Sequence, residues 1–168
     1  MRPGFACLRG AAALLAALYL LASVPAQAKA LKVGEPFPAF SLPSLGKVDF
    51  STGTLKGKTV VIYFWNNLCG CTEQLLALKG YISAQEKKPF AFVTVNEGQA
   101  KAIPEDFLRD NRLSYQVLLD TDMALGKKQL GIRVLPTVFV IGKDGLLKEK
   151  LIGMVDTRKL QSIFGRYL

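Results

Sequence analysis

Two cysteines separated by one residue, Cys69 and Cys71, are the side chains that most directly indicate chemistry in this chain. A thiolate is the attacking species in thiol-disulfide exchange and a ligand for soft metal ions. The chain has 168 residues, a third cysteine at Cys7 and no histidine. The lack of histidine excludes Ser-His-Asp and Cys-His nucleophiles, histidine-ligated zinc or copper, and haem held by an axial histidine. The pair therefore indicates redox or thiolate-metal chemistry.

The spacing of the pair makes a demand on the residue between them. Residues i and i+2 of a helix point in nearly opposite directions, so a Cys69–Cys71 disulfide needs a non-helical link. Gly70 is the residue type that permits one. The closed ring is smaller than that of a Cys-x-x-Cys pair, so we expect a strained, labile and oxidising disulfide. Such a pair either gives its disulfide away readily or is held reduced for disulfide reductase or isomerase work. Because so small a loop gains little stability from cross-linking, a purely structural disulfide is disfavoured.

The first 28 residues have the pattern of a secretory signal peptide. Two arginines precede an apolar Ala/Leu run over residues 10–24, and the small-x-small triplet 26–28 suits signal peptidase. The run is shorter than the ~20 residues that a membrane span needs. We therefore expect cleavage after residue 28 and a single exported domain over 29–168, which is not an integral membrane protein.

The charge of the chain is basic but dispersed. It has 22 Lys and Arg against 13 Asp and Glu, with Lys87-Lys88 and Lys127-Lys128 as doublets. A nucleic-acid footprint would cluster these charges, so no nucleic-acid partner is expected. An ordinary solvated surface that weakly steers acidic partners or an anionic membrane surface is expected instead.

The elements that must position the cysteines alternate between buried strands and helices. Runs of β-branched and aromatic residues predict strands over 59–65, 90–95, 115–119, 134–141 and 146–152. Helical patterns are found over 69–88, with Leu75, Leu76 and Leu78 in its apolar stripe, over 101–111 and 122–129, and from a cap at Asp156 to about Arg166. A small hairpin of 39–42 with 48–50 precedes them. The order predicts an α/β fold with a central mixed sheet and helices on both faces.

Two features of this arrangement concern the site. Cys69 is expected where a buried strand meets a helix N-terminus, whose free N–H groups and partial positive charge stabilise a thiolate. Pro136 is expected at the start of a strand, where its missing N–H suggests a cis peptide. An ordinary edge-strand proline is the alternative for Pro136.

Several segments resemble the TlpA-like (ResA-like) thioredoxins, which are exported bacterial thiol-disulfide oxidoreductases. The resemblance is carried by Phe64-Trp65-Asn66-Asn67-Leu68-Cys69, by Gly131 to Thr137 with its proline, by Lys143-Asp144-Gly145 and by the lead-in 33–42. It implies a thioredoxin-like fold with an N-terminal β extension, a periplasmic location and no cofactor or metal. It also implies cysteine-containing envelope proteins as substrates and a membrane or periplasmic redox partner.

The resemblance further implies roles for individual residues. Cys69 and Cys71 would be the catalytic pair, and Trp65, Leu135 and Pro136 would contact the substrate. Trp65 also has a simpler interpretation as a core aromatic at a strand end.

The sequence differs from these relatives in the spacing of its two cysteines. Their motif is Cys-x-x-Cys, whereas here one residue separates the cysteines. With one residue deleted, Cys71 is the resolving cysteine and Gln74 replaces a glutamate often found there. Without a gap, Thr72 occupies the resolving position. The spacing leaves both alignments open.

Two other functions compete at the pair. Two thiolates are the ligands of a Cu(I)-binding thioredoxin-fold chaperone, although no further Cys, His or nearby Met completes a closed site. Cys71-Thr72-Glu73 is faintly similar to the peroxidatic segment of peroxiredoxins, but Leu68 stands where their threonine would precede the cysteine.

Overall fold

The computed structural model describes residues 31–46 and 50–168. The predicted signal peptide over 1–28 and most of the predicted 48–50 strand lie outside these residues. In chain order the elements are β1 (Ser41–Leu42), β2 (Phe50–Ser51), the 3-10 helix η1 (Thr52–Leu55), β3 (Thr59–Trp65), α2 (Cys71–Ser83), β4 (Phe90–Glu97), α3 (Ala102–Asn111), β5 (Gln116–Asp120), the π-helix η2 (Ala124–Gln129), β6 (Thr137–Ile141), β7 (Leu147–Ile152) and α4 (Thr157–Gly165).

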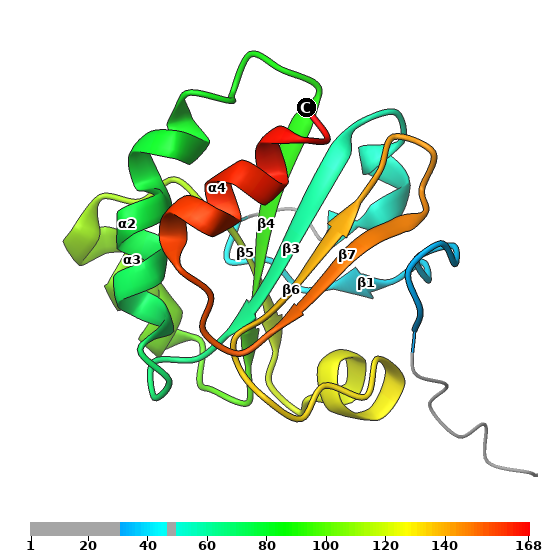
Figure 1. Ribbon diagram of the computed structural model, residues 1–168. Coiled ribbons are helices and arrows are strands. Elements are labelled where there is room, and N and C mark those ends of the chain that lie inside the picture. The colour runs from blue at the N-terminus through cyan, green and yellow to red at the C-terminus, as the bar shows by residue number, and fades with distance from the viewer. Residues whose placement is uncertain (1–30, 47–49) are drawn as a thin grey trace, which may run out of the picture.

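Five strands form one mixed sheet in the order β5-β4-β3-β6-β7 (Figure 1). β3, β4 and β5 run parallel, whereas β6 runs antiparallel to both of its neighbours. All seven residues of β3 are buried, as its unbroken apolar pattern predicted for a central strand. The chain leaves the carboxyl end of this strand directly into the cysteine pair.

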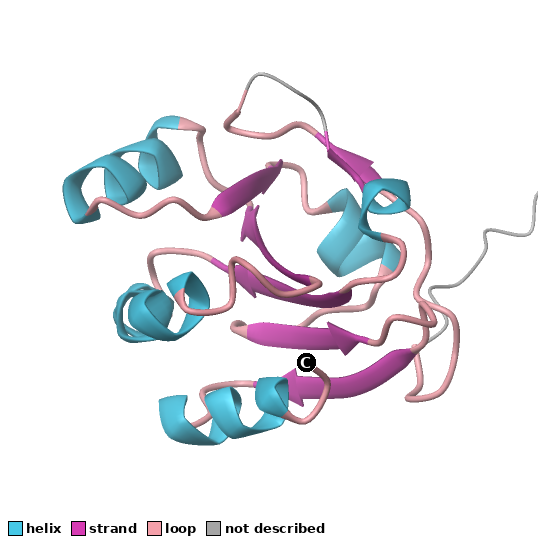
Figure 2. Ribbon diagram, turned by 90° about the horizontal axis from the view of Figure 1, so that it is seen from above, coloured by secondary structure: helices cyan, strands magenta, loops and turns pink. Residues whose placement is uncertain are grey.

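Alternate side chains of β3 pack into two separate cores, one on each face of the sheet. Val61 and Trp65 lie in the core with residues of α2 and α4, whereas Ile62 and Phe64 lie in the other core. Residues of α2, α3 and α4 belong to the first core and residues of η1 and η2 to the second, and Figure 2 shows helices on both sides of the strands. Helices on both faces are thus confirmed, but unequally: the α-helices cover the cysteine face, and η1 and η2 lie on the other.

An N-terminal β extension closes the second face. β1 pairs antiparallel with β2, which confirms the predicted hairpin. Ahead of it, residues 34–37 lie along the β6–β7 turn: Gly34 N–H donates to the Leu147 carbonyl at 2.8 Å, and Phe37 N–H to the Gly145 carbonyl at 3.0 Å. The extension therefore contacts the far end of the chain.

The helix predicted over 69–88 is shorter at both ends, as α2 over Cys71–Ser83. It begins two residues late because Gly70 is left-handed, with φ of 66°, which no right-handed helix accommodates. It ends early because the chain turns through i→i−3 bonds, such as Gln85 N–H to the Ile82 carbonyl, before a proline. Its apolar stripe also differs, since Leu76 is 38% exposed.

The strand predicted from residue 134 begins instead at Thr137. The Leu135–Pro136 peptide is cis, as expected, and the proline has no N–H to give to the ladder, so residues 134–136 form a loop. The remaining predictions agree with the structure to within two residues. Asp156 caps α4 as predicted, accepting from the Lys159 N–H at 3.1 Å.

Every helix within the described residues is too short or too polar to span a bilayer.

Candidate active site

Cys69 and Cys71 form a disulfide, with Cα atoms 5.2 Å apart. Gly70 between them supplies the non-helical link that the sequence required, in a left-handed conformation, and it is also the N-cap of α2. Cys71 is therefore the first residue of the helix, and Cys69 lies just before the cap. The expected position of Cys69 as the first helical residue is wrong by two residues for the same reason.

The two sulfurs differ in exposure. Cys71 is fully buried against the core under α2, whereas Cys69 is partly exposed and Gly70 beside it is exposed. Only Cys69 can therefore meet the thiol of another protein without movement of the loop.

The start of α2 favours negative charge on either sulfur. Gly70 offers no side-chain cap, so the first N–H groups of the helix are left for other acceptors. These groups and the helix dipole stabilise a thiolate. Two local features oppose this effect: Glu73 brings a carboxylate into the first turn, and the Asn66 carbonyl lies 3.4 Å from Cys69 Sγ, where it would accept from a protonated thiol.

The loop between β3 and Cys69 is anchored by amides. Asn66 Oδ1 accepts from the Leu68 N–H at 2.9 Å, which closes a tight turn. Gln99, just after β4, accepts from the Asn67 N–H at 3.1 Å and from Asn96 Nδ2 at 2.9 Å, and its own amide donates to the Asn67 side chain. Sequence reasoning missed Asn96 and Gln99. The one feature of the sequence that could have indicated them is their position at the carboxyl end of the predicted strand that pairs with β3.

The cis-proline loop lies at the same edge of the sheet. Phe64 pairs with Thr137, so the residues that follow β3 and those that precede β6 meet there. Thr137 Oγ1 donates to the Val134 carbonyl at 2.7 Å, and the Pro136 carbonyl accepts from the Gly153 N–H at 2.8 Å. Leu135 packs against both cores, and Cys69 packs against the one under α2. The structure thus brings Leu135 and Pro136 to the end of the molecule that holds the cysteines.

Trp65 is fully buried, with its ring centroid 5.2 Å from that of Phe107 on α3. Its indole packs beneath the site. Three other apolar side chains at this edge are exposed instead: Leu68 (83%), Val134 (49%) and Met154 (56%). Sequence reasoning did not single these out as a surface, because isolated apolar residues in loops carry no pattern.

A neutral hydrogen-bond chain lies behind Cys71. Tyr63 O–H donates to Gln74 Oε1 at 2.7 Å, and Gln74 Nε2 donates to the Val155 carbonyl at 2.5 Å. Burial raises the pKa of Tyr63 far above its ordinary value, so the phenol keeps its proton. Gln74 ties α2 to the segment before α4.

A buried acid pair lies on the opposite face of the sheet. Glu97 is 5% exposed and Asp120 1% exposed, and Asp120 accepts from the backbone N–H groups of Leu125 and Gly126 at 3.2 and 2.8 Å. Burial raises the pKa of Glu97 to about 8, and the hydrogen bond and charge of Asp120 add to this. Glu97 lines a cavity of about 810 Å³ that also has Asn66 and Leu135 in its wall. Sequence reasoning missed this pair.

Within residues 31–46 and 50–168, no group of three or more His, Cys, Asp or Glu side chains is arranged to hold a metal ion. A Cu(I) site at the pair would therefore rest on the two sulfurs.

Comparison with known proteins gives one family and consistent relatives. The model of the AhpC/TSA family matches residues 33–150. Sporulation thiol-disulfide oxidoreductase A of Bacillus subtilis is 28% identical over 149 residues, covering 86% of this chain and 89% of that protein. Thiol:disulfide interchange protein DsbE of Pseudomonas fluorescens is 28% identical over 152 residues, with 83% of each chain covered.

Solved structures agree with this fold. A putative thioredoxin from Neisseria meningitidis superposes with a TM-score of 0.70 at 28% identity, covering 83% of this chain and 91% of that one. StoA of Bacillus subtilis superposes with a TM-score of 0.63 at 26% identity, covering 77% and 97%.

Proposed function

The chain belongs to the AhpC/TSA family as a thioredoxin-fold thiol-disulfide oxidoreductase, and on that premise we propose that Cys69 and Cys71 are its exchanging pair. One observation carries the proposal: the two sulfurs are bonded at the start of a helix, with Cys69 accessible and Cys71 buried. Cys69 is then the sulfur that bonds to the partner, and Cys71 the one that resolves.

The exchange runs in two balanced steps. A thiolate of the partner attacks Cys69 Sγ, the Cys69–Cys71 bond breaks, and Cys71 leaves as a thiolate at the first position of α2. A second partner thiolate then attacks the partner's own sulfur in the mixed disulfide and releases Cys69 as a thiolate. The partner loses two electrons and the pair gains them. The reverse sequence reduces a partner disulfide.

The deletion alignment follows from this assignment. Cys71 bonds to Cys69, whereas the Thr72 hydroxyl donates to Glu73 at 3.0 Å. In the same alignment Gln74 stands in place of the relatives' glutamate, so a neutral amide replaces an acid behind the resolving sulfur.

Partner proteins dock on the apolar edge around the pair. Leu135 and Pro136 lie there with exposed Leu68, Val134 and Met154. Exposed apolar groups beside a reactive sulfur suit an extended, cysteine-bearing segment of another protein, and they supply the contact area that a single sulfur lacks. Trp65, which the resemblance places among the substrate contacts, is fully buried and supports this surface from beneath instead.

We also propose that the protein acts after export, in the periplasm, as the domain over residues 29–168. The support is the N-terminal pattern of arginines, an apolar run and a small-x-small triplet. A compartment in which disulfides persist suits the pair, and the substrates would be cysteine-containing envelope proteins served by a membrane or periplasmic redox partner.

The test compares Cys69→Ser and Cys71→Ser in the reduction of insulin or of a disulfide-bonded peptide. Cys69→Ser should abolish exchange, whereas Cys71→Ser should accumulate a mixed disulfide, visible on a non-reducing gel, with turnover at least 100-fold lower. Full dithiol turnover by Cys71→Ser would remove Cys71 from the mechanism. Tight Cu(I) binding or peroxide consumption without exchange would support the rival functions instead.

A further inference from the structure

A cavity of about 450 Å³ lies at the end of the sheet opposite the cysteine pair. Its wall includes the start of β3 at Val60, whereas the pair follows the end of that strand at Trp65. At about 3.3 Å per residue, the strand places most of its length between the two. The residues of this cavity have no part in the site described above.

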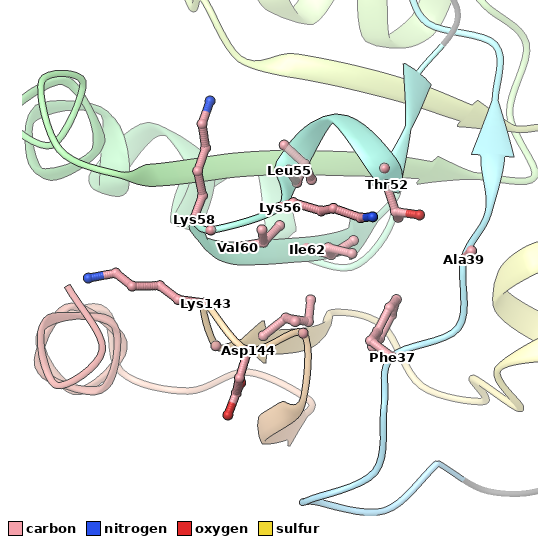
Figure 3. Close-up of a pocket in the computed structure, with 15 residues that line it drawn as sticks. Phe37, Ala39, Thr52, Leu55, Lys56, Lys58, Val60, Ile62, Lys143 and Asp144 are labelled. Atoms are coloured by element: carbon pink, nitrogen blue, oxygen red, sulfur yellow. The ribbon is translucent and has the colours of Figure 1, made fainter.

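The inner wall of the cavity is apolar. Val60, Ile62 and Ile141 form the part that belongs to the sheet, and all three are buried from solvent at 6% exposure or less. Phe37 from the N-terminal extension and Leu55 from η1 line the sides. Figure 3 shows Phe37, from the N-terminal extension, and Ile62, from β3, directed toward the same space. Bound water would find few polar partners along this wall.

The rim of the cavity is cationic. Lys56, Lys58 and Lys143 line it, and within the described residues none of these three side chains has a hydrogen-bond or ion-pair partner. Figure 3 shows Lys58 and Lys143 extending from one edge and Lys56 lying across the sheet wall. Asp144, the acidic residue of the lining, is already engaged, since it lies 2.7 Å from Lys148 Nζ and accepts from the Leu146 N–H at 3.1 Å.

We propose that this cavity binds a single-chain amphiphile with an anionic head, of the medium-chain fatty-acid class. The apolar wall takes the alkyl chain, and the lysines at the rim pair with the carboxylate. The volume falls within the range of pockets that enclose small ligands. A second copy of this chain is the poorer occupant, because a protein with 22 Lys and Arg against 13 acids would bring like charge to a lysine rim.

The test is isothermal titration calorimetry, in which dodecanoate is added to the full chain at concentrations below its critical micelle concentration. We expect saturable one-to-one binding that weakens about fourfold for each methylene removed in decanoate and octanoate. Dodecyltrimethylammonium, which has the same chain and the opposite charge, should bind at least tenfold more weakly.

Two variants test separately what the rim lysines and the space inside the wall contribute to binding. Lys56→Gln/Lys58→Gln/Lys143→Gln should weaken dodecanoate binding at least tenfold. The control triple Lys79→Gln/Lys101→Gln/Lys159→Gln makes the same change in net charge at exposed residues on the helical face that carries α2, α3 and α4, and it should bind normally. Ala39→Trp places an indole in the cavity and should block binding with the lysines intact. Disulfide exchange should stay unchanged in all of them, which confirms that each variant is folded.

Several results would overturn the proposal. These are no saturation by dodecanoate, equal binding of the cationic amphiphile, equal loss in the control triple, or unaltered binding in Ala39→Trp. Self-association that buries the rim and excludes dodecanoate would also overturn it, and sedimentation velocity detects that directly.

Discussion

Leu68 precedes the accessible cysteine and is 83% exposed, which is unusual for a large apolar side chain held in a tight turn. If it contacts partner proteins, Leu68→Ser should raise KM for a protein disulfide at least threefold. The rate with a small dithiol such as dithiothreitol should not change, because the sulfurs and α2 are untouched.

The matched control is Leu76→Ser, which removes a partly exposed leucine from α2. Steady-state kinetics with both substrates distinguishes the two. An equal KM effect in the control, or a loss of dithiothreitol reactivity in Leu68→Ser, would contradict a docking role.

Glu97 is a described residue whose shifted pKa bears on the stability of the fold near neutral pH. Its pKa in the folded protein is about 8 against an ordinary value of 4.5, so between these values the folded state holds a proton that the unfolded chain has released. The contribution of Glu97 to stability is therefore fully present below about pH 4.5 and is lost as pH rises toward 8. Relative to Glu97→Gln, wild type should lose on the order of 2–4 kcal/mol of unfolding free energy across this window.

Glu97→Gln is a suitable comparison because it keeps a side-chain hydrogen-bond donor beside Asp120 but does not titrate. Urea unfolding of both proteins at pH 5, 6.5 and 8 gives the difference. Parallel pH profiles for the two proteins would show that Glu97 ionises normally in the fold.

At the scale of elements, Gly70 decides where α2 begins. The oxidised pair holds this residue at φ of 66°, a conformation that costs an L residue about 1–2 kcal/mol. The reduced pair can relax from it. Gly70→Ala should therefore destabilise the oxidised form selectively and raise the reduction potential by about 20–40 mV.

Gly80→Ala is the control, since it lies within α2 and an added Cβ there meets nothing within 4 Å. Equilibration of each variant with glutathione buffers measures the potential. A potential for Gly70→Ala equal to that of wild type would mean that the link is equally constrained in both redox states.

Some elements and site residues could be predicted from sequence patterns, and others could not. β3 was predicted correctly at Thr59–Trp65, because an unbroken run of β-branched and aromatic residues is typical of a strand that is buried on both faces. The start of α2 was placed at Cys69 from the helical pattern, although a Cys69–Cys71 disulfide requires a non-helical link at Gly70 and so moves the start to Cys71. The cysteine pair and the cis-proline were found from residue type. The Asn96–Gln99 anchor and the Glu97–Asp120 pair were not, because polar residues at strand ends acquire partners only when the sheet forms.

At the scale of the whole molecule, excess positive charge should act on association. Lys and Arg outnumber Asp and Glu by 22 to 13, without clustering in the sequence. For an acidic dithiol peptide, kcat/KM should fall severalfold between 20 and 500 mM salt, because the Debye length shortens from tens of Å to a few. For a basic peptide of equal length it should stay flat or rise.

Stopped-flow kinetics with the two peptides tests this. Identical salt profiles would show that the charge is too evenly spread to steer partners, as an ordinary solvated surface would be.

The contact of residues 34–37 with the β6–β7 turn has a consequence for the order of events in synthesis. Gly34 and Leu147 are bonded although more than a hundred residues separate them. A chain emerging from its N-terminus cannot make this closure until nearly all of it is present, and such long-range pairing is slow. The N-terminal extension therefore reaches its final place late, only after the β6–β7 turn that it contacts has been synthesised.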